Sequence, residues 1–122
     1  MDHRSKKLKQ EYKLAKRPMG VFLIRNTTNN KVFVVSGIDL QGIINRHKFE
    51  LSAGGHKNLE LQRDWNELGS AMFEIEIVDQ MEPLDDPGFD ARRELAFMEE
   101  MWLEKLQPYD ERGYNKRKNP GR

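Results

Sequence analysis

The stretch GVFLIRNTTNNKVFVVS, residues 20–36, decides the fold. Residues 20–26 hold an almost continuous apolar run, which is typical of a strand that is buried on both faces. Asn29 and Asn30 favour a tight turn, because asparagine tolerates a positive φ. Residues 31–36 are rich in β-branched and aromatic side chains, so the two runs and the turn between them predict a β-hairpin.

Three helices are predicted after the hairpin, each with signals that begin or end it. Asp39 and Asn58 can cap the first two helices, and glycines at Gly54 and Gly69 can end them. The third helix has the strongest periodicity in the chain and ends before a proline. The predicted helices cover residues 40–53, 59–68 and 91–106.

A third strand is predicted over residues 72–79, where apolar residues alternate with glutamates. This alternation indicates one buried face and one face in water. The order of the elements predicts an α/β (α+β) fold, a three-stranded sheet flanked by helices. We expect one shared core made of Phe22, Ile24, Phe73, Ile75, Ile77, Leu95, Trp102 and Leu106.

Length and composition restrict the class of protein. A chain of 122 residues fits a single domain. It has no cysteine, which excludes disulfides and thiolate metal sites, and no apolar run of about 18 residues that could span a membrane. We therefore expect a cytoplasmic protein without a membrane partner.

The net charge of +1 is small, but basic and acidic residues are concentrated in different parts of the chain. Residues 1–17 hold seven Lys or Arg and two acids, and residues 112–122 hold five basic residues and no acid. The remainder is acidic, most of all after Phe73. The sequence thus predicts a basic N-terminal arm (1–17) containing a short helix (4–16), a folded domain (18–115) and a basic tail (116–122). Such arms either bind nucleic acid or are solvated ends of the chain.

Two polar residues lie within predicted apolar stripes. At 100° per residue, Glu99 falls at the centre of the apolar face of the last helix. Because burial of a carboxylate is costly, Glu99 is expected to pair with a cation, bind a metal or lie at the open edge of the core. His47 occupies the same kind of position on the helix 40–53, where a histidine is either a satisfied core residue or a functional one.

The ordered set of motifs resembles the GIY-YIG nuclease family over about residues 18–115. Gly20-Val21-Phe22 resembles the first motif of that family, and residues 31–36 stand where its second motif lies. The set continues with Asp39-Leu40, Asn45-Arg46-His47, Leu51, Gly55-His56, Leu61-Gln62, Trp65-Asn66, Gly69, Phe73, Glu99-Glu100-Met101-Trp102-Leu103 and Gly113-Tyr114-Asn115.

The resemblance implies a fold and a chemistry. It implies that the three strands are antiparallel and that DNA is cleaved with one divalent metal, Mg²⁺ or Mn²⁺, held by Glu99. His47 and Asn115 match residues that the family retains. The DNA-binding residues expected from the resemblance and from the basic arms are Lys6, Lys7, Lys9, Arg46, His56, Asn115, Lys116, Arg117 and Lys118.

Several positions depart from the family pattern in ways that matter chemically. Phe22 and Phe33 stand where the family has tyrosines, and phenylalanine has no hydroxyl to accept a proton or orient water. Ile43 stands in place of an arginine that steadies the phosphate, and isoleucine has no donors. Val35 stands in place of a glycine and adds bulk.

Three functional hypotheses follow. The first is a DNA-binding relative whose cleavage is weakened or silent. The second is an active metal-dependent endonuclease that uses Glu99, with His47 as base and Arg46 as phosphate clamp. The third is a protein-interaction module that keeps only the scaffold and binds a partner through its acidic region, residues 74–111.

Overall fold

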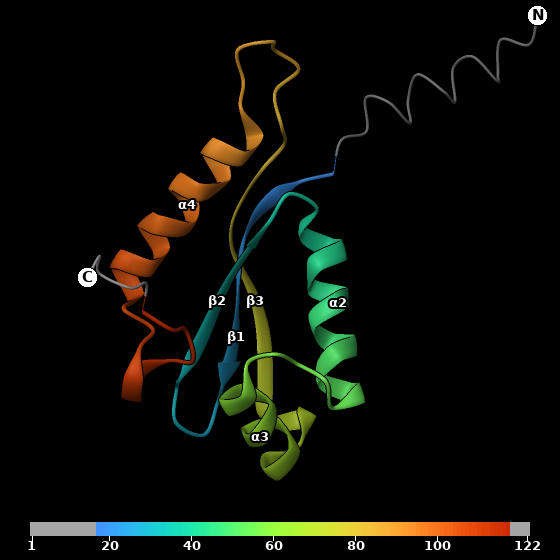
Figure 1. The fold of residues 1–122 in the computed structure, drawn as a ribbon, viewed down its shortest axis with the longest axis vertical. Helices are drawn as coiled ribbons and strands as arrows, with labels where there is room; N and C mark the ends of the chain where they lie inside the picture. The colour runs from blue at the N-terminus through green and yellow to red at the C-terminus, as the bar shows by residue number, and fades with distance from the viewer. Residues whose placement is uncertain (1–16, 118–122) are drawn as a thin grey trace, which may run out of the picture.

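The computed structural model describes residues 17–117, which form an antiparallel three-stranded sheet between helices (Figure 1). The strands are β1 (Met19–Asn26), β2 (Val32–Gly37) and β3 (Phe73–Met81), in the spatial order β2-β1-β3. The helices are α2 (Leu40–Ala53), α3 (Leu59–Leu68) and α4 (Ala91–Leu106). The predicted fold class is therefore confirmed. The predicted helix 4–16 and the candidate residues Lys6, Lys7, Lys9 and Lys118 lie outside the described residues.

β1 is the central strand, and both of its faces are buried. Phe22 and Ile24 face α2 and α3, whereas Met19, Val21 and Leu23 face α4. All five side chains are at most 2% exposed, as the continuous apolar run predicts. Close packing against β3 also explains the glycine near the start of the strand, since a Cβ at Gly20 would lie 2.0 Å from the carbonyl oxygen of Asp79.

The predicted hairpin and helix caps are confirmed. β1 and β2 pair around a turn in which Asn30 adopts a φ of 65°. The side chain of Asp39 accepts the Gly42 N–H at the start of α2, which ends at Gly54 in the left-handed conformation. Asn58 accepts the Leu61 N–H in the same way at the start of α3. These local signals fix where α2 and α3 begin.

The prediction of one shared core is wrong, because the sheet separates two cores. Phe73 and Ile75 pack with Phe22 and Ile24 on the α2 side. Leu95, Trp102 and Leu106 instead pack with Met19, Val21 and Leu23 on the α4 side. A helix pattern shows which face is apolar but not which face of the sheet it covers, so the sequence does not separate the two clusters.

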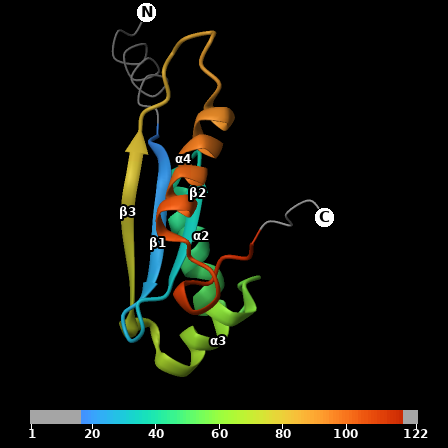
Figure 2. The same ribbon diagram turned by 90° about the vertical axis from the view of Figure 1, so that its left-hand side faces the viewer.

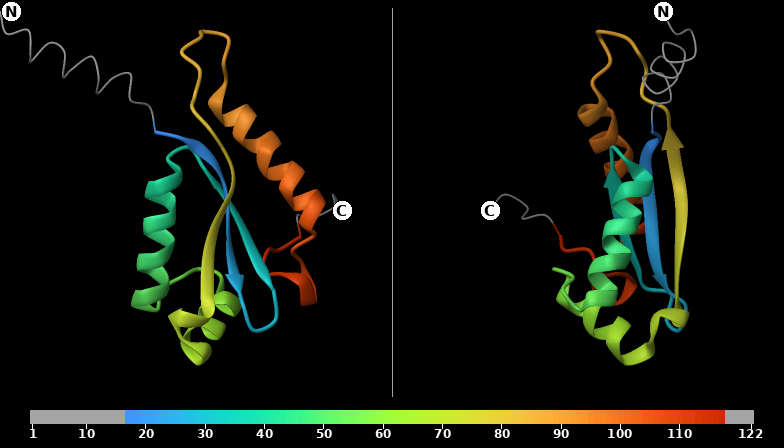
Figure 3. Two further views of the ribbon diagram at one scale, coloured as in Figure 1. Left: turned by 180° about the vertical axis from the view of Figure 1, so that it is seen from behind. Right: turned by 90° about the vertical axis from the view of Figure 1, so that its right-hand side faces the viewer.

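β3 is less buried than its alternation predicts. The pairing shifts between Val21, which faces Asp79, and Phe22, which faces Ile77, so Val78 is an extra residue on β3. Figures 2 and 3 show α4 and α2 lying over β1 and β2 on opposite faces, with β3 at the margin. Ile77, expected in the core, is accordingly 45% exposed.

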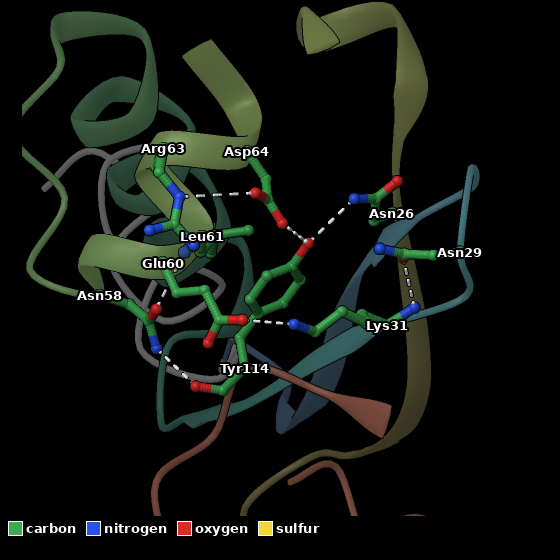
Figure 4. Close-up of polar contacts among 9 residues, drawn as sticks. All are labelled: Asn26, Asn29, Lys31, Asn58, Glu60, Leu61, Arg63, Asp64 and Tyr114. Carbon is green, nitrogen blue, oxygen red and sulfur yellow. Dashed lines mark hydrogen bonds and ion pairs between the residues drawn. The ribbon is translucent and has the colours of Figure 1, made fainter. Parts of the chain in front are cut away.

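The segment after α4 returns to the free edge of β2. Gly113 pairs in parallel with Val32, and the Tyr114 N–H donates to the Val32 carbonyl over 2.9 Å. Tyr114 is buried, and its hydroxyl donates to Asp64 (2.7 Å) and accepts from the Asn26 amide (2.9 Å), as Figure 4 shows. This segment therefore ties the C-terminal part of the domain to β1, β2 and α3. Within residues 17–117, no helix is long and apolar enough to cross a membrane.

Candidate active site

Two histidines and two phenylalanines meet on the α2 side of the sheet. His47, on the inner face of α2, lies edge-on to Phe22 of β1 with ring centroids 5.8 Å apart. Phe33 of β2 approaches both His47 (6.0 Å) and His56 (5.7 Å), which lies in the link between α2 and α3. The structure thus brings together four residues that sequence analysis assigned to the site.

The two imidazoles are joined by a hydrogen bond. His47 Nδ1 and His56 Nε2 are 2.8 Å apart, and His56 Nδ1 accepts the backbone N–H of Asn58 over 3.0 Å. Burial, followed by the neighbouring His56, lowers the pKa of His47 from 6.5 to about 4. Burial also lowers the pKa of His56. Both rings are therefore neutral near pH 7, and the pair adds no charge to the site.

Charged side chains surround the histidine pair. Ligand atoms of His47, Glu50 and His56 lie within 4.8 Å of one another, which makes them a candidate metal group among residues 17–117. The Nε of Arg46 lies 3.4 Å from Glu50, on the exposed side of α2. The charges of Arg46 and Lys57 also act on His47. Glu50 and Lys57 are not among the residues that the sequence predicts for the site, although Glu50 stands one helical turn after His47 and on the same side of α2.

The position matched to the family's arginine is packed against the sheet. A Cβ at Gly37 would lie 2.5 Å from Cγ1 of Ile43, so this side chain rests directly on the backbone of β2. Ile43 and Val35 are half-buried against the cluster that contains Phe22. Phe22 and Phe33, which contact His47, and Ile43, one turn before it on α2, form an apolar wall that offers no side-chain hydrogen-bond donor.

Glu99 lies on the other side of β2. It is half-buried on α4, and one carboxylate oxygen accepts a hydrogen bond from the Ser36 hydroxyl. Ser36 stands between Val35 and Gly37, which face α2, so its side chain projects toward α4. This hydrogen bond explains how a carboxylate lies on an apolar helix stripe, and sequence analysis did not identify Ser36 as its partner. Glu99 does not belong to the group of His47, Glu50 and His56.

Of the described candidate DNA-binding residues after α4, Asn115 and Arg117 have partners within the chain. Both ends of the Asn115 amide bind the backbone of Val34, at 2.8 and 3.0 Å. Arg117 pairs with Asp110 over 3.0 Å and lies over the Tyr109 ring. Lys116 is exposed. Among these, Lys116 is the residue most open to a phosphate.

Comparisons with known proteins agree with the architecture. No model of a protein family matches the sequence. The chain is 39% identical over 62 residues to intron-associated endonuclease 1 of Enterobacteria phage T4, a match that covers 51% of this chain. The matched region spans only 25% of that phage protein.

Two solved structures resemble nearly the whole described domain. A structure of the catalytic domain of the homing endonuclease I-TevI superposes with a TM-score of 0.66 at 30% identity, covering 82% of this chain and 99% of that one. A point mutant of the same domain gives a TM-score of 0.65 at 30% identity, covering 80% and 92%. The strand order, the helix placement and the ordered motifs agree with this likeness, and the chain belongs to the GIY-YIG nuclease family, as a relative of the I-TevI catalytic domain.

Proposed function

We propose that this chain is a DNA-binding domain of the GIY-YIG nuclease family whose phosphodiester cleavage is weakened or silent. The observation that supports this proposal is the apolar wall around His47. Phe22 is fully buried, Phe33 lies against both imidazoles, and Ile43 rests on the backbone of β2. Three positions beside the histidine pair therefore lack any group that can move a proton or bind an oxyanion.

The expected kinetic penalty is large. Loss of one preorganised donor to a developing charge typically lowers the rate by about 10²–10³-fold. Losses inside one catalytic unit do not simply add, but Phe22 and Phe33 both lack the hydroxyl that the family's tyrosines supply. Arg46, the candidate substitute for the missing arginine, is paired with Glu50.

Binding of DNA is supported by the cations that remain exposed. Arg46 and Lys57 are exposed near the histidine pair, Lys48 is exposed on α2, and Lys116 follows the segment that covers β2. Contacts of lysine and arginine with phosphates supply most of the affinity of a nonspecific DNA-binding protein. The basic arms of the sequence would add to this attraction.

A divalent ion fits Glu99 better than it fits the histidine pair. Mg²⁺ and Mn²⁺ prefer oxygen ligands, and Mg²⁺ commonly keeps several waters while it binds one or two carboxylates. The half-buried carboxylate of Glu99, oriented by Ser36, meets that requirement. When bound, such an ion would neutralise phosphate charge. By contrast, the mutual hydrogen bond of His47 and His56 already uses the nitrogens that would face an ion.

Protein binding is the second candidate function, supported by a different surface. Phe97 and Met101 stand one turn apart on α4 and are 59% and 49% exposed, beside the acidic residues Glu100 and Glu104. This apolar and acidic face would repel DNA but could contact a protein.

Two assays on the full chain test the proposal together. Retention of duplex DNA should weaken steeply as salt increases. Nicking of supercoiled plasmid with Mg²⁺ or Mn²⁺ should be far slower than nicking by an intact member of the family. Rapid metal-dependent nicking that Glu99→Ala abolishes would favour an active endonuclease. Absence of salt-sensitive DNA retention would favour the protein-binding function.

A further inference from the structure

The hydrogen bonds around His56 determine which of its ring nitrogens carries the proton. The backbone N–H of Asn58 points at His56 Nδ1 over 3.0 Å, and a peptide N–H can only donate. Nδ1 must therefore be the acceptor. A neutral imidazole carries one proton, so the proton of His56 is on Nε2.

The position of the proton on His47 follows from that on His56. Because His56 Nε2 carries a hydrogen, it donates to His47 Nδ1 over their 2.8 Å separation. His47 Nδ1 is then the acceptor, and the proton of neutral His47 is on Nε2. Both hydrogen bonds therefore donate in the same direction: the Asn58 backbone N–H donates to His56, and His56 donates to His47.

The backbone N–H of Asn58, which is the first donor in this series of hydrogen bonds, is held in place by its neighbours. The Asn58 side chain accepts the Leu61 N–H at the start of α3 and donates to the Tyr114 carbonyl over 2.7 Å. The backbone N–H of His56 is bound by Gln62 Oε1 at 2.9 Å. Reversing the two tautomers would set an N–H of His56 against the N–H of Asn58 and leave a buried donor without a partner, which is unfavourable.

His47 Nε2 remains open for a ligand. No hydrogen bond within residues 17–117 uses this atom, yet no buried side-chain nitrogen or oxygen of the described residues lacks a partner. Nε2 therefore keeps contact with solvent. Of the charged side chains that act on His47, Glu50 has the largest effect, and Arg46 and Lys57 oppose it. An N–H with cations nearby suits an anionic oxygen.

We propose that His47 is a fixed, neutral hydrogen-bond donor to a phosphodiester oxygen of DNA, and that His56 and the Asn58 backbone are its positioning groups. This inference rests on the DNA binding proposed above. It also assigns His47 a role opposite to that of a general base, because a base needs a lone pair at the exposed nitrogen. His47 and His56 then form a proton-ordered pair, and with Glu50 they do not form a metal site, since His56 Nε2 carries a hydrogen.

The tautomers can be measured without DNA. Long-range ¹H–¹⁵N correlation spectra at pH 7 distinguish protonated from unprotonated ring nitrogens, and both His47 and His56 should be protonated at Nε2. In His56→Ala, His47 should populate both tautomers. In His56→Gln, the amide can accept from Asn58 and donate to His47, so the Nε2–H form should return. A His47 protonated at Nδ1 in the wild-type chain would overturn the proposal.

The role toward phosphate is tested by the salt dependence of duplex binding. His47→Leu should weaken binding roughly tenfold, the effect of one hydrogen bond to a charged group, with an unchanged log–log salt slope because no charge is lost. His47→Gln keeps an N–H and should retain more of the affinity. Arg46→Gln, the matched charged control, should lower the slope by about one. Circular dichroism confirms that each variant is folded.

The outcomes separate the two proposals. Duplex retention that His47→Leu leaves unchanged would overturn the donor role alone. A lower salt slope in His47→Leu would mean that His47 acts as a cation, which also overturns it. Absence of any duplex retention by the wild-type chain would overturn the proposed function, and the donor role with it.

Discussion

The side-chain amide of Asn115 binds both the N–H and the carbonyl of Val34, at 2.8 and 3.0 Å, and so takes the place of a neighbouring strand at the edge of β2. A free strand edge exposes a row of unpaired backbone groups. Asn115 covers this edge at Val34, directly after the parallel bridge between Gly113 and Val32. The contact of Asn115 with DNA, expected from the sequence, stays a prediction.

Replacing Asn115 with alanine should destabilise the domain by about 1–2 kcal/mol, because two hydrogen bonds to half-buried backbone are lost. Urea unfolding followed by circular dichroism measures this change. Lys116→Ala, which alters an exposed neighbour, is the control and should be close to neutral. Equal stability of the two variants would mean that the C-terminal segment does not depend on the Asn115 amide.

Removing one hydroxyl should have a comparable effect at Tyr114. In Tyr114→Phe, Asp64 loses a donor and the buried amide of Asn26 loses its acceptor (Figure 4). We expect a loss of roughly 2 kcal/mol in the free energy of unfolding, since a buried polar group is left unsatisfied. Tyr109→Phe is the matched control at a half-buried tyrosine. A loss below that of the control would show that water replaces the hydroxyl.

Stability should fall on acidification from about pH 6.5 to about pH 4. The unfolded chain binds a proton at His47 near its usual pKa of 6.5, whereas burial lowers the pKa of the folded form to about 4. Below pH 6.5 the unfolded state therefore binds more protons, and folding is opposed. At roughly 1.4 kcal/mol per pKa unit, His47 accounts for at most about 3 kcal/mol, and His56, whose pKa is also lowered, acts in the same direction.

Chemical unfolding at a series of pH values measures this loss. The double variant His47→Gln with His56→Gln should show a shallower pH dependence over the same window, because its side chains do not titrate. An unchanged dependence would mean that carboxylates, and not the histidine pair, control the acid sensitivity.

The sequence predicts those parts of the fold that local chemistry fixes. Asp39, Asn58 and Gly54 mark helix ends through their own side chains or conformations, and the structure confirms them. The bulge that adds Val78 to β3 depends on pairing with β1, so no local feature of the sequence indicates it. The separation of the two cores likewise depends on which face of the sheet each helix covers.

The site is predicted less completely, for the same reason. His47 and Glu99 are conspicuous as polar residues on apolar helix faces. Their partners come from distant segments: Ser36 binds Glu99 from β2, and His56 binds His47 from the link before α3. A sequence pattern identifies a polar residue that needs a partner, but the partner is chosen by tertiary packing.

Glu99 should account for any binding of divalent ions. Titration calorimetry with Mg²⁺, or Mn²⁺ relaxation, should show weak binding to the wild-type chain, because water would fill most of the coordination shell. Glu99→Gln should remove it, whereas Glu100→Gln, at the exposed neighbouring position, should not. Identical binding by the wild-type chain and Glu99→Gln would exclude Glu99 as a ligand. A more stable but otherwise unchanged Glu99→Gln would indicate a strained structural carboxylate.

The last prediction concerns restoration of cleavage. The combined change Phe22→Tyr, Phe33→Tyr, Val35→Gly and Ile43→Arg should raise the rate of plasmid nicking, and Glu99→Ala added to it should abolish the gain. A hydroxyl on residue 33 would extend from a ring that already lies within 6.0 Å of His47 and 5.7 Å of His56, measured between ring centroids. Ile43→Arg alone should do less, because a phosphate clamp cannot replace a group that activates water.

The main obstacle to this restoration is packing at residue 43. Ile43 rests on the backbone at Gly37, so an arginine there must leave the sheet and reach solvent, or remain buried and destabilise the domain. Circular dichroism must therefore establish folding before any rate is interpreted, and Ile43→Lys offers a second cation of different shape at the same place. A folded combined variant that cleaves no faster than the wild-type chain would show that the four substitutions are not what limits catalysis. Rapid Mg²⁺-dependent nicking by the unmodified chain, lost in Glu99→Ala, would show that the apolar wall beside His47 is compatible with cleavage.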